Sequence, residues 1–99
     1  MARKQLTAVR LAAGAPATGW QLAHIERVTT LEDGKQFPRD EPRDQVARAV
    51  NAGDPYYVRT ADGAEVPVRA QLRHGKYLLV TTTTPGEPEP LLALPVHGR

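Results

Sequence analysis

The amino-acid sequence predicts an α+β fold: a small antiparallel β-sheet of about four to six strands, rich in hairpins, with one α-helix packed on one face. Most apolar segments have two-residue spacing, which is typical of half-buried strands. Short Gly-containing turns separate them, and only about residues 41–52 show helical spacing. With 99 residues, 40% hydrophobic and 24% charged, the chain fits a single domain over residues 1–99. We expect its core at about residues 5–84 and a Pro-rich connector at 85–90.

The N-terminal third predicts two strands. Residues 6–11 (LTAVRL) precede a stretch that contains Gly and Pro, and residues 24–31 (HIERVTTL) precede Asp33-Gly34. An Asp-Gly pair is typical of tight turns, because glycine accepts the positive φ that such turns require. Residues 35–37 are a candidate for a brief returning strand.

The one predicted helix follows. Asp40 can act as its N-cap, and Pro42 suits its first turn. Gly53 stands where a left-handed residue is expected to end it. Spacing of i, i+3 and i+4 defines a stripe that should face the sheet, made of Val46, Ala49 and Val50. The residues expected to face away from the sheet are Arg43, Arg48 and Asn51.

Residues 55–84 predict two consecutive hairpins. A three-residue loop that ends in a bulged Gly63 places Arg59 opposite Glu65. A two-residue loop would instead place Arg59 opposite Val66, which breaks the match between the apolar faces of the two strands. We therefore predict the bulged register.

The second hairpin turns at His74-Gly75. A two-residue loop there pairs Leu72 with Tyr77. Pro67 cannot donate a ladder hydrogen bond from its own nitrogen, so we expect its outward side to lie at a sheet edge or a bulge. The apolar residues predicted to share one face of these strands are Val66, Val68, Ala70, Leu72, Tyr77 and Leu79.

The apolar segment at residues 91–96 (LLALPV) is too hydrophobic for a solvated tail, so we expect it to dock back on the core. Strand alternation would turn Leu92 and Leu94 to the same face. It would leave Leu91 or Ala93 nearer to solvent or to a second chain.

The order of these pieces resembles a known family. They are Thr7-Ala8-Val9, Ile25-x-x-Val28, Arg43-Asp44-x-Val46, Gly53-x-x-Tyr56-Tyr57-Val58, Lys76-Tyr77-Leu78 with following threonines, and Leu91-Leu92-x-Leu94-Pro95. Over about residues 5–95 the chain is similar to the bacterial domain of unknown function 3892. Where that family commonly has Asp-Gly and Asn, this chain has Pro85-Gly86 and Pro90. The resemblance implies a compact α+β domain and brings no activity, cofactor or catalytic residue.

The composition argues against several classes of function. The chain has no Cys and no Ser, which excludes disulfides, Cys-based zinc sites, thiol nucleophiles and Ser-centred hydrolases. It has no apolar run long enough to span a membrane and no signal-peptide stretch, so we expect a cytoplasmic protein. His24, His74 and His97 lack metal-ligand spacing, and the glycines of 14–19 lack a following Lys-Thr pair. We expect no metal, no cofactor and no enzyme activity.

A binding role remains. The net charge is +2 without a block of like charge. Trp20 is expected to cap one end of the core, with a partner anchor as the alternative. The candidate partner-binding residues are Trp20, Tyr57, Arg59, Arg69, Arg73 and Lys76. We expect a small non-catalytic module that binds an unknown protein partner through a sheet face or edge. The alternative is weak single-stranded nucleic-acid binding by the Arg/Tyr surface.

Overall fold

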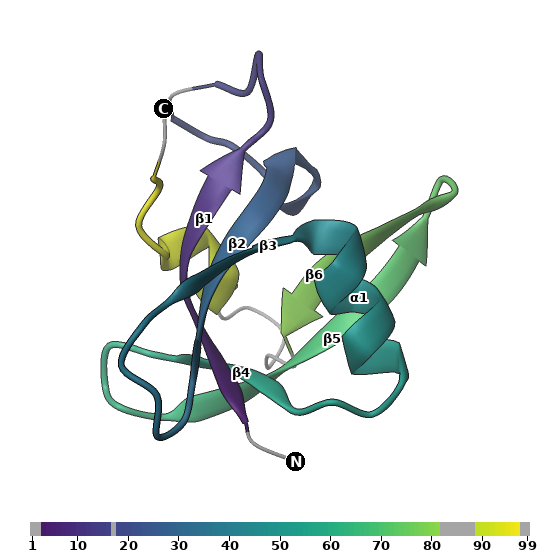
Figure 1. Ribbon diagram of the computed structural model, residues 1–99. Coiled ribbons are helices and arrows are strands. Elements are labelled where there is room, and N and C mark those ends of the chain that lie inside the picture. The colour runs from purple at the N-terminus through teal and green to yellow at the C-terminus, as the bar shows by residue number, and fades with distance from the viewer. Residues whose placement is uncertain (1–2, 17, 82–88, 98–99) are drawn as a thin grey trace.

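A computed structural model describes residues 3–16, 18–81 and 89–97. These residues form an α+β fold, with one α-helix, two 3-10 helices and a six-stranded, mostly antiparallel sheet of strand order β3-β2-β1-β4-β5-β6 (Figure 1). The elements are β1 (Lys4–Leu11), the 3-10 helix η1 (Leu22–His24), β2 (Ile25–Glu32), β3 (Arg39–Pro42), α1 (Arg43–Asn51), β4 (Tyr56–Arg59), β5 (Glu65–Arg73), β6 (Lys76–Thr81) and the 3-10 helix η2 (Pro90–Ala93).

The sheet is organised around β4, a strand of four residues between two longer neighbours. It pairs with β1 in parallel only as far as Gln5, and with β5 in antiparallel orientation only as far as Pro67. Because the two pairings have opposite directions, β1 continues beyond β4 at one end and β5 continues beyond it at the other. Each of these two longer strands therefore has a stretch of residues without β4 beside it, and we call such a stretch an overhang.

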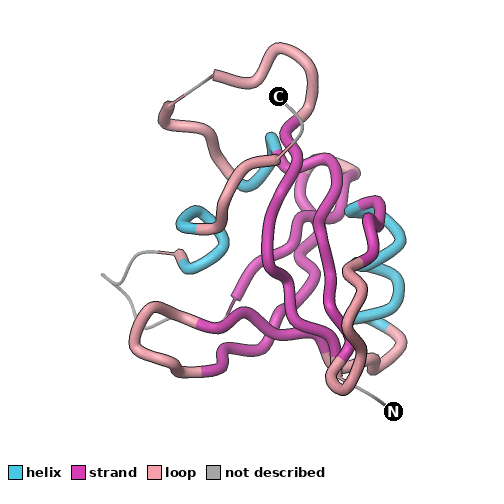
Figure 2. The backbone as a smooth tube through the Cα atoms, turned by 60° about the vertical axis from the view of Figure 1, so that its left-hand side comes forward, coloured by secondary structure: helices cyan, strands magenta, loops and turns pink. Residues whose placement is uncertain are grey.

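The core lies between the sheet and the helices on its two sides. Figure 2 shows α1 on one side of the strands and the two short helices on the other. One connected cluster of buried side chains joins them, including Leu6, Val9, Ile25, Val28, Val46, Ala47, Val58, Leu79 and Leu91. Trp20 is partly buried and packs against this cluster.

Residues 95–97 fill the overhang of β1. The Val9 N–H donates to the Pro95 carbonyl over 2.9 Å, and the His97 N–H donates to the Val9 carbonyl over 2.9 Å. The expected alternation in this segment is wrong: Leu91 is fully buried and Leu92 is 37% exposed. The reason is that Pro90–Ala93 forms a 3-10 helix, with about three residues per turn, instead of a strand. Residues 85–88 of the expected connector lie outside the described residues.

Both hairpin registers are confirmed. Arg59 pairs with Glu65 across a three-residue loop, in which Gly63 has a φ of 90°. Leu72 pairs with Tyr77 across a two-residue loop. In that loop His74 and Gly75 have φ values of 50° and 77°, the two positive values that a type I′ turn requires.

Pro67 lies on β5, an interior strand of the sheet. The ladder to β4 ends at Pro67, and the described ladder to β6 begins at Val68. A residue without an N–H is tolerated there because the pairing changes partner at that point.

The expected strand at residues 35–37 and the expected N-cap at Asp40 are both wrong, whereas the helix expected at about residues 41–52 is present. The returning strand is β3, and α1 begins after it at Arg43 with no side-chain cap. Asp40 accepts a 2.5 Å hydrogen bond from Arg27 of β2 instead of capping the helix. Pairing with β2 therefore holds Arg39–Pro42 extended, although the residues RDEP have little strand propensity.

The helix orientation is confirmed in part. Val46 is buried, Ala49 and Val50 pack against the core, and Arg48 is exposed. Ala47, which the narrow stripe omitted, is also buried. Arg43 does not face away from the sheet, because its Nη1 donates to the Ile25 carbonyl over 2.9 Å. The helix ends as expected, with Gly53 at a φ of 101°.

Candidate functional site

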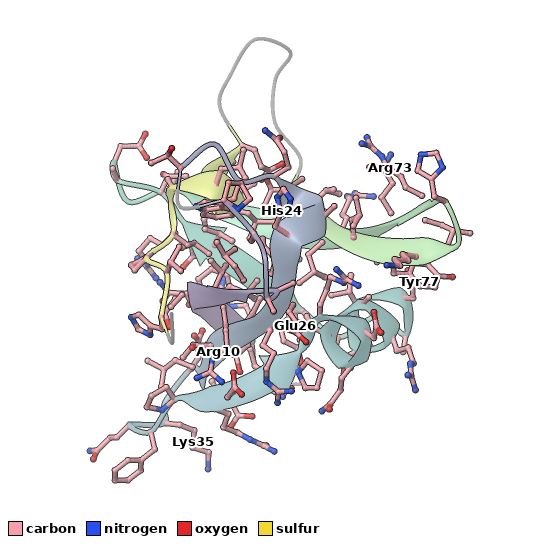
Figure 3. All side chains as sticks on the ribbon, turned by 90° about the horizontal axis from the view of Figure 1, so that it is seen from above. Arg10, His24, Glu26, Lys35, Arg73 and Tyr77 are labelled. Carbon is pink, nitrogen blue, oxygen red and sulfur yellow. The ribbon has the colours of Figure 1, made fainter. Side chains whose placement is uncertain are left out.

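The structure does not gather the six predicted binding residues into one site. Trp20 packs on the core, and Tyr57 is buried on β4. Arg59 is held in an ion pair, and Arg69 lies midway along β5. Arg73 and Lys76 lie at the tip of the β5–β6 hairpin, which projects beyond α1 (Figure 3).

The hairpin tip forms a mixed apolar and cationic surface. We call the group Leu72, Arg73, Lys76, Tyr77 and Arg48 of α1 the hairpin-tip surface. Leu72 is 59% exposed and Tyr77 39% exposed, although they face each other across the two strands. Arg73 and Tyr77 point to opposite sides of the hairpin (Figure 3). The three cations form no ion pair within the described residues.

This exposure was missed because the sequence places Leu72 and Tyr77 on the face that α1 covers. The lengths of the predicted elements could have revealed this exposure. A nine-residue helix is about 14 Å long, whereas a nine-residue strand such as β5 is about 30 Å long. The helix therefore covers the half of the hairpin near the core and leaves its tip uncovered.

A groove separates α1 from the hairpin tip. Its volume is about 530 Å³, and its lining includes Arg43, Asp44, Arg48, Lys76 and Tyr77. Asp44 is the only acid among these lining residues, and its Oδ1 lies 3.6 Å from Nη2 of Arg43. Two cations thus remain unbalanced beside an aromatic ring, which suits a ligand that carries negative charge and an apolar group.

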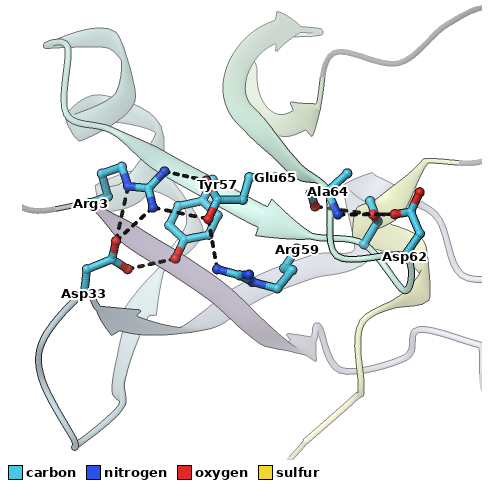
Figure 4. Close-up of polar contacts among 8 residues, drawn as sticks. Arg3, Asp33, Tyr57, Arg59, Asp62, Ala64 and Glu65 are labelled. Atoms are coloured by element: carbon cyan, nitrogen blue, oxygen red, sulfur yellow. Dashed lines mark hydrogen bonds and ion pairs between the residues drawn. The ribbon is translucent and has the colours of Figure 1, made fainter.

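Tyr57 is the centre of a separate, charge-balanced cluster (Figure 4). Its hydroxyl donates to Asp33 Oδ1 over 2.8 Å, and the Arg3 guanidinium lies 4.5 Å from its ring centroid. Arg3 also pairs with Glu65 over 2.6 Å, and Arg59 pairs with the same carboxylate over 2.9 Å. These contacts join the start of β1 to the β2–β3 turn and to β5.

The electrostatics of this cluster agree with a structural role. The hydrogen bond from Tyr57, followed by that from Arg3, lowers the pKa of Asp33. The hydrogen bond from Arg3 lowers the pKa of Glu65. Two arginines and two carboxylates neutralise one another here, so little charge remains to attract a ligand.

A second polar cluster lies inside the fold and was not expected from the sequence. Glu41 is only 3% exposed, and its carboxylate accepts hydrogen bonds from Thr30 over 2.5 Å and from Tyr56 over 3.5 Å. Burial, together with the charge of Glu41, raises the pKa of Tyr56. Because Thr30 and Tyr56 are themselves buried, this arrangement pins β3 to the sheet.

One further exposed aromatic side chain lies away from the hairpin tip. Phe37 is 82% exposed in the β2–β3 loop and borders a pocket of about 220 Å³ with Lys4, Lys35 and Arg39. Within the described residues, no group of three or more His, Asp or Glu side chains is placed to hold a metal ion.

No family model, curated protein or solved structure matches this chain. The resemblance to the domain of unknown function 3892 therefore stays a prediction. Within the described residues, no helix is long and apolar enough to cross a membrane.

Proposed function

We propose that this protein is a small, non-catalytic, cytoplasmic interaction module that binds an acidic and partly apolar segment of a partner protein at the hairpin-tip surface. The observation that supports this most directly is the exposed pair Leu72 and Tyr77 among cations that have no acid partner in the described chain.

The chemistry of the surface defines the partner. Burial of Leu72 and Tyr77 removes apolar area from water, and Tyr and Arg are favoured at the energetic centres of protein interfaces. Arg48, Arg73 and Lys76 attract carboxylates, which increases the association rate and selects against basic partners. An acidic segment with one or two large apolar side chains complements both the apolar pair and the cations of this surface.

The same geometry disfavours the nucleic-acid alternative. Base stacking needs exposed aromatic rings, but Tyr56 and Tyr57 are only 5% and 6% exposed. Tyr77 is then the one Tyr ring that is accessible to a base. Within the hairpin-tip surface, a single ring beside two unpaired cations is a weak platform compared with the several stacked bases of single-strand binders.

Selection from a displayed library of random twelve-residue peptides tests the proposal. Peptides enriched on the purified protein should combine Asp or Glu with Leu, Phe or Tyr. A double variant, Leu72→Ser with Tyr77→Ser, should weaken their binding at least tenfold. Phe37→Ser is the matched control, because it removes another exposed apolar side chain in the β2–β3 loop and should leave binding unchanged.

Thermal unfolding of the double variant shows whether it is folded, since one cross-strand pair contributes only about 0.2–1 kcal/mol. Peptides that bind wild type and the double variant equally would contradict the proposal. Tight binding of oligo(dT) that the double variant loses, with no peptide enrichment, would instead favour the nucleic-acid alternative.

A further inference from the structure

The β5–β6 hairpin has an unpaired backbone flank. In a two-residue hairpin the residues beside the turn, Arg73 and Lys76, form a hydrogen-bonded pair, and such pairs then alternate along the ladder. The backbone groups of Ala70 and Leu72 therefore point away from β6, toward the line of β4. Because β4 pairs with β5 only as far as Pro67, it does not reach them.

The other flank of the hairpin supports this assignment. The same alternation turns the N–H of Thr81 outward from β6, and it donates to Glu89 Oε2 over 3.3 Å. Glu89 thus covers part of the β6 edge. The outward groups of Ala70 and Leu72 make no corresponding hydrogen bond within the described residues.

The chain itself shows how such a flank is filled. The short β4 leaves two overhangs, one on β1 and one on β5. The overhang of β1 receives residues 95–97, which bond both the N–H and the carbonyl of Val9. No segment of the described chain fills the overhang of β5.

Open space lies beside part of this flank of β5. A cavity of about 540 Å³ borders this flank, with Val68 and Ala70 on one wall and Val50 and Asn51 of α1 on the other. Its lining along β5 ends at Ala70, and Leu72, two residues further toward the turn, is 59% exposed. A neighbouring strand needs about 4.8 Å of lateral space.

We propose that the partner segment binds as an added β-strand along residues 68–73 of β5, with main-chain hydrogen bonds to Ala70 and Leu72. Because side chains alternate between the two faces of a strand, this binding mode predicts the sequence pattern of the partner segment. Side chains on one face of the added strand meet Leu72 and should be apolar, and those on the other face meet Arg73 and should be acidic. This inference rests on the proposed function and specifies how the hairpin holds its partner.

Amide hydrogen exchange with a synthetic eight-residue peptide of alternating Val and Glu is the first test. In the free protein the amides of Ala70 and Leu72 should exchange at least tenfold faster than that of Gln71, which is bonded to β6. Saturating peptide should slow Ala70 and Leu72 at least tenfold. Slow exchange at both in the free protein, or no slowing with peptide, would overturn the inference.

Two N-methylated forms of the same peptide give a control that leaves the protein unchanged. One form is methylated on every Val nitrogen and the other on every Glu nitrogen, so each blocks one edge of the added strand. Only one of the two should lose binding, by tenfold or more. If both bind as well as the parent peptide, partners are held by side chains alone, and strand addition is wrong while the proposed function stands. If both methylated peptides lose binding equally, pairing of β5 with a single edge of the peptide is also wrong.

The variant Ala70→Pro tests the same point from the protein side. Its missing N–H points away from β6, so the hairpin ladder should survive, whereas Gln71→Pro should break it. Folded Ala70→Pro protein should bind the parent peptide at least tenfold more weakly. Unchanged binding by that variant would contradict main-chain pairing.

Discussion

Replacing Leu91 by Ala should destabilise the fold strongly, whereas replacing its neighbour Leu92 should not. Leu91 is fully buried in the core cluster, and Leu92 is 37% exposed on the same 3-10 helix. Removal of a buried Leu side chain to Ala costs about 2–5 kcal/mol, because the lost transfer energy is increased by the cavity that remains. The exposed Leu92 should cost less than about 1 kcal/mol.

A thermal melt followed by circular dichroism measures the difference. For a domain of this size about 1 kcal/mol corresponds to roughly 4–8 °C in Tm. A loss of about 3 kcal/mol for Leu91→Ala should therefore lower the Tm by about 12–24 °C, and Leu92→Ala by only a few degrees. A shift of only a few degrees for Leu91→Ala would refute the inference that docking of residues 91–96 stabilises the fold, and a larger shift for Leu92→Ala would refute the assignment of Leu91 as the buried residue behind it.

Two further predictions concern polar groups. Because the pKa values of Asp33 and Glu65 are lowered in the fold, their stabilisation is present above about pH 4 and is lost as the pH falls through the lowered values. Tm measured from pH 6 downward should show this fall, and Arg3→Ala should flatten it; identical profiles would exclude the ion pairs as its cause. Glu41→Ala, which leaves the buried Thr30 hydroxyl without its acceptor, should cost about 1–3 kcal/mol in urea unfolding. A cost below about 0.5 kcal/mol would contradict a pinning role.

The parts of the fold that sequence reasoning predicted correctly depend on local chemistry. Gly63 and the His74-Gly75 pair fix the two hairpin registers, since only certain residues accept the positive φ that these turns need. Gly53 marks the end of the helix for the same reason.

The parts that sequence reasoning missed depend on contacts between distant segments. β3 forms because Arg39–Pro42 pairs with β2 and because Glu41 meets Thr30, neither of which local propensity indicates. Leu91 is buried because its segment turns as a 3-10 helix against the core. Strand alternation could not predict that geometry.

The candidate site was predicted only in part, for a geometric reason. Arg73 and Lys76 were among the predicted residues and lie at the exposed tip. Tyr57 is buried, and Leu72 was assigned to the covered face. Which aromatic rings are accessible depends on how far α1 reaches along the hairpin, and that distance is set by the whole fold.

Site-specific photocrosslinking in cells that express the protein tests the central claim most directly. A photoreactive benzoylphenylalanine replaces Tyr77 in one strain and Phe37 in another, and both positions are exposed aromatic residues. We expect position 77 to give a defined protein adduct in which the crosslinked segment is acidic and partly apolar, and position 37 to give none. No adduct at position 77, or the same adduct from both positions, would contradict recognition through the hairpin-tip surface.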